Sequence, residues 1–140
     1  KADGRPSYAA QFTDLLEIWA EVIRERPTVI AGDLNASAQG PSVKDHTENL
    51  ALATKLGLIS SYHAFHRVAS GEERDMTLEW FGQGRVPYSY HCDFVFVPKT
   101  WVPALRSVEV GNWDQWVHSG RSDHAPVMID VDEVILRSPD

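Results

Sequence analysis

Three short apolar runs, each with acidic, amide or imidazole side chains beside one end, limit most strongly how this chain can fold. The runs with their polar neighbours are Thr28–Ala31 with Asp33 and Asn35, Phe94–Val97 with Asp93, and Val127–Val131 with Asp123 and His124. Short β-branched and aromatic runs bounded by turn residues are typical of buried strands. Because loops held by rigid strands often carry reactive groups, we expect these three strand ends to carry one functional site.

The rest of the pattern predicts two helices and further strands. Apolar residues three and four apart predict an amphipathic helix from Tyr8 to about Arg26, ended by Pro27. A second helix is expected at Thr47–Leu56, with Gly57 as its stop. The other expected segments are strands at Met76–Phe81 and Leu105–Val110, irregular structure at Ile59–Asp75, a turn at Gly82–Gly84 and a loop at Gly111–Arg121. Two helices and about five strands predict an α+β domain spanning residues 1–140.

Charge and composition narrow the function classes. The 140 residues carry a net charge of −7, and the basic residues are scattered rather than gathered in a stripe. An acidic chain can still act on phosphates if a bound metal supplies the positive charge. No apolar run approaches the roughly 18 residues of a transmembrane helix. The single cysteine, Cys92, excludes a disulfide within the chain, and a cytoplasmic location is favoured.

The polar residues at the three strand ends suit phosphate-ester hydrolysis. Asp33, Asn35 and Asp123 offer hard oxygen donors of the kind that Mg²⁺ or Mn²⁺ prefers. His124 could accept a proton from water, and Asp93 could orient its ring. Taken singly, each acid is more often a turn or strand cap, and a single histidine is more often structural. Their joint occurrence at strand ends favours the catalytic interpretation.

Three segments resemble motifs of the endonuclease/exonuclease/phosphatase superfamily, which includes exonuclease III-like and DNase I-like nucleases. Residues 29–35 (VIAGDLN) resemble its GD[FL]N motif, residues 90–97 (YHCDFVFV) an intervening strand, and residues 122–127 (SDHAPV) its terminal SDH motif. The resemblance implies that His124 is the catalytic histidine and Asp93 its orienting carboxylate. It also implies that Asp33 and Asn35 contact the nucleophilic water and the metal-bound phosphate, with Asp123 beside the metal.

The resemblance covers only the second half of that family's domain, a four-layer α/β sandwich of two similar halves. It implies a mainly antiparallel sheet of about five strands with two helices on one face. The chain begins at Lys1 without a methionine, and no residue matches the metal-binding glutamate of the first half. We therefore expect a C-terminal fragment whose uncovered sheet face pairs with the missing N-terminal half or with a second copy.

Substrate and rival functions stay open at this stage. The family acts on nucleic acids, nucleotides and phospholipids, and Trp113 and Trp116 could either stack on a base or anchor their loop. One rival is a catalytically incomplete half-fold that acts as a binding or assembly module. Another is a zinc hydrolase, for which only His63 and His66 have suitable spacing; we expect that pair to lie on the surface.

Overall fold

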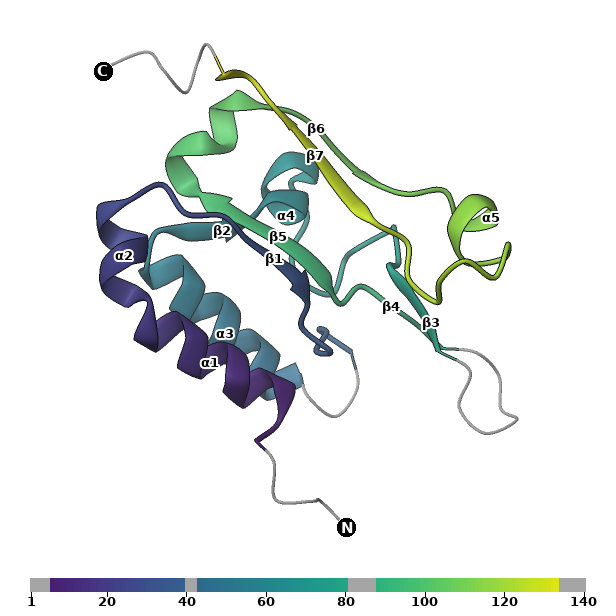
Figure 1. The fold of residues 1–140 in the computed structure, drawn as a ribbon, viewed down its shortest axis with the longest axis horizontal. Coiled ribbons are helices and arrows are strands. Elements are labelled where there is room, and N and C mark those ends of the chain that lie inside the picture. The colour runs from purple at the N-terminus through teal and green to yellow at the C-terminus, as the bar shows by residue number, and fades with distance from the viewer. Residues whose placement is uncertain (1–5, 40–42, 81–87, 134–140) are drawn as a thin grey trace.

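The computed structural model describes residues 6–39, 43–80 and 88–133, and its helices and strands are mixed along the chain (Figure 1). The elements are α1 (Tyr8–Ile18), α2 (Ala20–Glu25), β1 (Ile30–Asp33), α3 (Val43–Lys55), β2 (Leu58–Ser60), α4 (Ser61–His66), β3 (Leu78–Trp80), β4 (Tyr88–Tyr90), β5 (Asp93–Pro98), the 3₁₀ helix η1 (Lys99–Ala104), β6 (Leu105–Val110), α5 (Trp113–Trp116) and β7 (Val127–Val131). The expected turn at residues 82–84, and Phe81 at the end of an expected strand, lie outside the described residues. Mixed helices and antiparallel strands confirm the α+β class.

The predicted first helix is interrupted once. It begins where Ser7 caps it, since the Ser7 hydroxyl accepts a hydrogen bond from the Ala10 backbone N–H at 3.1 Å. Trp19, with φ −97° and ψ 9°, separates α1 from α2, a break that the apolar spacing does not reveal. The helix ends at Glu25, and Arg26 is extended, as expected for the residue before a proline.

β5 is the central strand of a three-stranded antiparallel sheet, with β1 on one side and β2 on the other. β3 pairs with β4 and β6 pairs with β7, so the strands form three hydrogen-bonded sets rather than the single expected sheet. The ladder of β3 and β4 stops before β5 because a side chain replaces a backbone acceptor there. The Thr77 hydroxyl accepts the backbone N–H groups of Cys92 and Asp93, at 3.0 and 3.1 Å.

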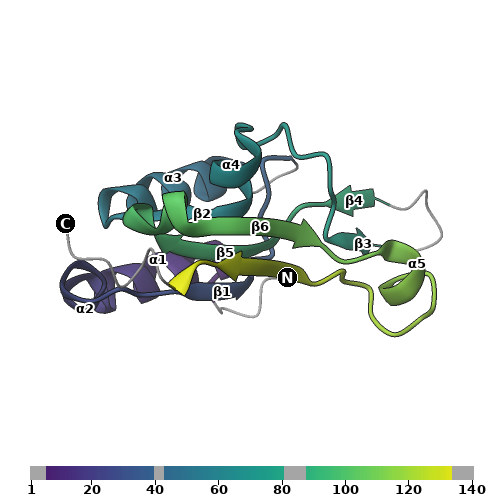
Figure 2. The same cartoon turned by 90° about the horizontal axis from the view of Figure 1, so that it is seen from above.

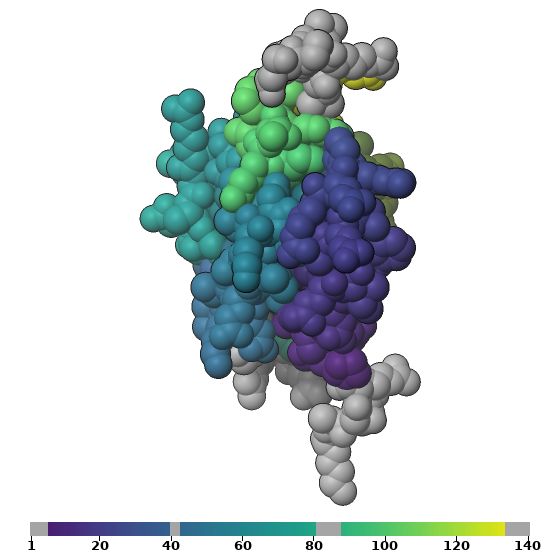
Figure 3. All heavy atoms as spheres, turned by 90° about the vertical axis from the view of Figure 1, so that its left-hand side faces the viewer, coloured from purple at the N-terminus to yellow at the C-terminus, as the bar shows by residue number. Residues whose placement is uncertain are grey.

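Two long helical segments cover one face of the central sheet, as expected. Figures 2 and 3 show α1 and α2 lying beside α3 along that face. Phe94 and Phe96 of β5 pack there in a buried cluster that also contains Phe12, Leu16, Ile23, Ala53, Leu56 and Leu58. α1 and α3 are also joined by polar contacts, because Asn49 donates to the Ala9 carbonyl at 2.9 Å and accepts from Thr13 at 2.6 Å.

Several strand and helix boundaries differ from the prediction. The second helix, α3, begins at Val43 rather than at Thr47, and the loop expected at Gly111–Arg121 contains α5. The strand expected at Thr28–Ala31 lies two residues later, and Thr28, which lies before it, donates its hydroxyl to the Arg26 carbonyl at 2.9 Å. Residues 61–66, expected to be irregular, form α4. None of the helices in the described part of the chain has both the length and the apolar character needed to cross a bilayer.

Candidate active site

The structure brings Asp33, Asp93 and His124 together from three separate segments. Asp33 and Asp93 are directly opposite each other in the pairing of β1 with β5, so their side chains share one face of the sheet. The loop before β7 places His124 against Asp93, with its Nδ1 atom 2.8 Å from Asp93 Oδ2. This hydrogen bond joins residues 31 positions apart and forms a histidine–carboxylate pair.

A tight turn fixes the Asp33 carboxylate. Its two oxygens accept the backbone N–H and the side-chain amide of Asn35, at 2.7 and 2.6 Å. Asn35 has a φ of 46°, in the left-handed region that asparagine tolerates better than most residues. Leu34 between them donates to the Cys92 carbonyl at 2.9 Å and ties the turn to the start of β5. Asp33 and Asn35 are both exposed.

Cys92 joins this group, although the sequence did not single it out. Asp33, Cys92, Asp93 and His124 offer donor atoms that all lie within 4.8 Å of one another, a grouping able to hold a metal ion. Burial raises the pKa of the Cys92 thiol, and the negative charges of Asp93 and Asp33 raise it further. Cys92 is therefore a protonated thiol at neutral pH, and the oxygen and imidazole groups are the ready donors of the site.

The carboxylates around His124 control its charge. Burial by itself lowers the pKa of the ring, but the hydrogen bond with Asp93 and the charges of Asp93, Asp33 and Asp123 outweigh that effect. The pKa of His124 is therefore raised above its ordinary value. Asp123 itself is exposed, and its backbone carbonyl accepts the Glu79 N–H at 3.1 Å.

The two tryptophans proposed for substrate contact lie apart from this cluster. The Trp113 indole N–H donates to the Met76 carbonyl at 2.8 Å, which fastens the short helix α5 to the chain before β3. Trp116, at the other end of α5, lies close to Gly111. Neither is among the residues that line the cavity beside the site. This arrangement matches the loop-anchor alternative.

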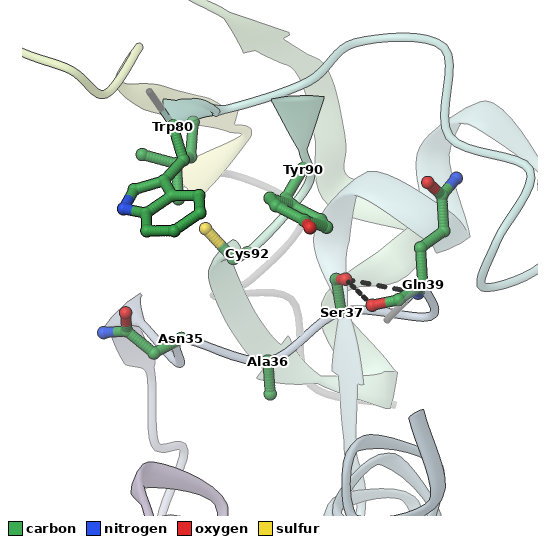
Figure 4. A pocket seen from close by; sticks show the side chains of 8 residues that line it. Asn35, Ala36, Ser37, Gln39, Trp80, Tyr90 and Cys92 are labelled. Atoms are coloured by element: carbon green, nitrogen blue, oxygen red, sulfur yellow. Dashed lines mark hydrogen bonds between the residues drawn. The ribbon is translucent and has the colours of Figure 1, made fainter. Parts of the chain in front are cut away.

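A cavity of about 380 Å³ borders the site, and Figure 4 shows the side chains around it. It is lined by Asn35, Ala36, Ser37, Gln39, Leu78, Trp80, Tyr90 and Cys92. Asn35 and Cys92 belong to the site as well, so the cavity opens beside the acidic group. The sequence analysis did not predict this cavity. The residues that could have indicated it are Trp80 and Tyr90, two aromatic residues on the paired strands β3 and β4.

His63 and His66 do not form a metal site with each other. His63 bonds to Ser60 and to the Glu73 carboxylate, both at 2.8 Å, while His66 Nε2 is 2.9 Å from the Val108 carbonyl. With 12% of its side chain exposed, His63 is also more buried than we expected. Among the described residues, neither histidine belongs to the metal-compatible group around Asp33.

Comparison with known proteins supports the fold. The chain is similar to a solved structure of the 3′ phosphatase NExo from Neisseria bound to a product DNA hairpin, with 20% identity and a TM-score of 0.63. It is also similar to the 3′-5′ exonuclease NExo from Neisseria meningitidis, with 22% identity and a TM-score of 0.62. The matches cover 86% of this chain but only 51% and 52% of those chains, so it spans about half their length. No family model and no curated protein sequence matches the chain.

Proposed function

We propose that this chain hydrolyses phosphate esters of nucleic acids, with Mg²⁺ or Mn²⁺ at the acidic group and His124 as the base. The observation that carries the proposal is the Asp93–His124 hydrogen bond of 2.8 Å beside the Asp33 turn. The two solved neighbours, a 3′ phosphatase and a 3′-5′ exonuclease, share the fold and support the substrate class.

The donor set fits a hard divalent cation. Asp33, Asn35 and Asp123 are exposed and offer carboxylate and amide oxygens, which Mg²⁺ and Mn²⁺ prefer. The raised pKa of Cys92 keeps the one soft donor protonated, so it does not compete with the carboxylates. When bound, such an ion neutralises the phosphate charge and stabilises the leaving oxygen.

His124 and Asp93 supply the proton transfer. Because Nδ1 of His124 donates to Asp93, its Nε2 atom is the nitrogen that can accept a proton from water. The water oxygen forms a bond to phosphorus, the phosphorus–oxygen bond to the leaving group breaks, and the water proton passes to Nε2. The carboxylates of Asp93, Asp33 and Asp123 then stabilise the charged imidazole ring.

The neighbouring cavity is suited to the group next to the reacting phosphate. Trp80 and Tyr90 give it aromatic walls, and its floor reaches Asn35 and Cys92 of the site. A flat sugar or base fits such a space through stacking and apolar contact. We assign substrate contact to Trp80 and Tyr90, while Trp113 and Trp116 anchor their loop.

The test is hydrolysis of bis-p-nitrophenyl phosphate and of a DNA hairpin with a 3′ phosphate, while Mg²⁺ or Mn²⁺ is titrated. We expect metal-dependent product release that is lost in His124→Gln. His118→Gln is the matched control, because His118 is an exposed histidine that pairs with Asp114 at 2.9 Å and lies outside the site. Hydrolysis that survives in His124→Gln would refute the assigned base.

A binding or assembly module is the second candidate, because the chain spans about half of the structures it resembles. A partner could lie on the sheet face opposite α1 and α3. There Ala31 of β1 is exposed and Val95, its neighbour on β5, is half-buried. The partner would be a longer chain's N-terminal half or a second copy. DNA-hairpin binding without hydrolysis, combined with dimers in sedimentation, would favour this candidate.

A further inference from the structure

We propose that Thr77 is a positioning residue, whose hydroxyl and backbone hold the Asp93 strand and the His124 loop in register so that the two side chains meet. The geometric part of the proposal stands on contacts within this chain. Its consequence for catalysis rests on the proposed function.

On the Asp93 side, the contact is made by the Thr77 side chain. Thr77 is fully buried, and its Oγ1 atom accepts the backbone N–H groups of two consecutive residues, Cys92 and Asp93. Its own backbone N–H donates to the Tyr90 carbonyl at 2.8 Å. Because a buried N–H without an acceptor is costly, these bonds fix the point where β4 leads into β5. That point sets the position of Asp93.

On the His124 side, the contacts are made by the backbone of the same short segment. The Thr77 carbonyl accepts the Ala125 N–H at 2.8 Å, and Leu78 is bridged to His124 in antiparallel fashion. The next residue, Glu79, donates to the Asp123 carbonyl at 3.1 Å. Thr77 and Glu79 therefore bond to the loop that presents His124, on either side of the Leu78–His124 bridge, while Thr77 also holds Asp93.

This support matters because the Asp93–His124 pair is partly open to water. The side chains of His124 and Asp93 are 28% and 19% exposed. Ion pairs that water can reach contribute little by themselves, so their own hydrogen bond is a weak means of fixing two separate segments. The buried Thr77 hydroxyl, which accepts hydrogen bonds from two backbone N–H groups, fixes the two segments more firmly.

The test follows the His124 ring proton by NMR, without metal or substrate. We expect a downfield proton on Nδ1, assigned by its absence in His124→Gln, because that proton is donated to Asp93. Thr77→Ser keeps the hydroxyl and should keep the signal. Thr77→Val has a similar shape but no acceptor, and the signal should be lost or exchange-broadened. Ile23→Val, a core change in α2 away from the site, should keep it.

Activity provides a second measurement for the same variants. Thr77→Val is expected to lower kcat by about tenfold to a hundredfold with little change in KM, the usual scale for losing support behind a reacting group. Thr77→Ser is expected to restore most of kcat. A purely structural role would lower the folded fraction and leave kcat per folded molecule unchanged, which would overturn the positioning role.

The two proposals can fail separately. If no variant hydrolyses any phosphate ester but the ring proton depends on the Thr77 hydroxyl, only the proposed function fails. If the ring proton persists in folded Thr77→Val, the positioning role fails. If Thr77→Val does not fold, hydrogen exchange of the wild-type chain tests the positioning role instead. The amides of Cys92, Asp93 and Ala125 must then exchange as slowly as those of the β1–β5 ladder, and rapid exchange would overturn the proposal.

Discussion

Two buried histidines are expected to make the protein lose stability as the pH falls below neutrality. His46 is 0% exposed and His91 is 3% exposed, and each has one ring nitrogen without a hydrogen-bond partner. Burial lowers the pKa of both rings. The Glu73 carboxylate offsets part of that effect at His46, and the hydrogen bond with the Asp75 carbonyl, together with Glu73, offsets part of it at His91. Both histidines are therefore held neutral in the folded state at pH values where the unfolded chain binds protons.

This difference in proton binding between the folded and unfolded states sets the sign and the size of the change in unfolding free energy with pH. The folded-state pKa of each ring lies below the ordinary histidine value of 6.5, so the stabilisation from the two neutral rings is present above pH 6.5 and is lost as the pH falls. At pH 5.5, one ring that is neutral in the folded state and charged in the unfolded state lowers the free energy of unfolding by at most about 1.4 kcal/mol. Two such rings lower it by at most about 2.8 kcal/mol. His124, with a raised pKa, acts in the opposite direction, and its contribution is fully present only below pH 6.5.

Urea unfolding at several pH values, followed by tryptophan fluorescence, measures this loss. His46→Phe removes one titrating ring and keeps an aromatic ring against Phe94, so the loss of unfolding free energy below pH 6.5 should fall by about half. His118→Gln on the surface should leave it unchanged. Equal unfolding free energy at pH 7.5 and pH 5.5, or an unchanged slope in His46→Phe, would refute the role of burial.

Three further outcomes follow from the site and the core. In the metal-free chain, Asp93→Asn should lower the pKa of His124 measured by NMR, because it removes the hydrogen-bonded carboxylate that raises it; an unchanged pKa would contradict the pairing. Phe96→Ala should cost about 3–5 kcal/mol of unfolding free energy in urea, since Phe96 is 1% exposed in the central cluster. Gly111→Ala should cost about 1–3 kcal/mol, because an added Cβ would lie 2.7 Å from Pro126; wild-type stability in thermal unfolding would show that the loop can shift.

The sequence predicted the parts of the fold that depend on local pattern. The strand at Leu105–Val110 lies where its alternation placed it, and the helix that begins after Ser7 starts at its cap. These features depend on periodicity and capping within a few residues. The short helix α4 was missed because six residues, two of them histidines, contain too few turns for a helical period to show.

Features set by contacts between distant residues could not be read from the sequence in the same way. The separation of the β3–β4 ladder from β5 depends on the Thr77 hydroxyl, which accepts two backbone N–H groups that lie 15 and 16 residues away. Cys92 enters the site because the β1–β5 register brings its neighbours close to Asp33, and register is a property of two strands together. The motifs predicted which residues carry chemistry, while these pairings determine how those residues lie relative to one another.

The Asp93–His124 pair is held in place by contacts within this chain, whereas the acids around it, Asp33 and Asp123, are exposed to solvent. The pair is supported by buried bonds within this chain, through Thr77 to Asp93 and Ala125. Asp33 and Asp123 are exposed, so a metal ion held by either would need further ligands from water, from substrate or from another protein segment. We therefore expect the pair to form whether or not a metal binds, and metal affinity to be the property that a partner segment would change.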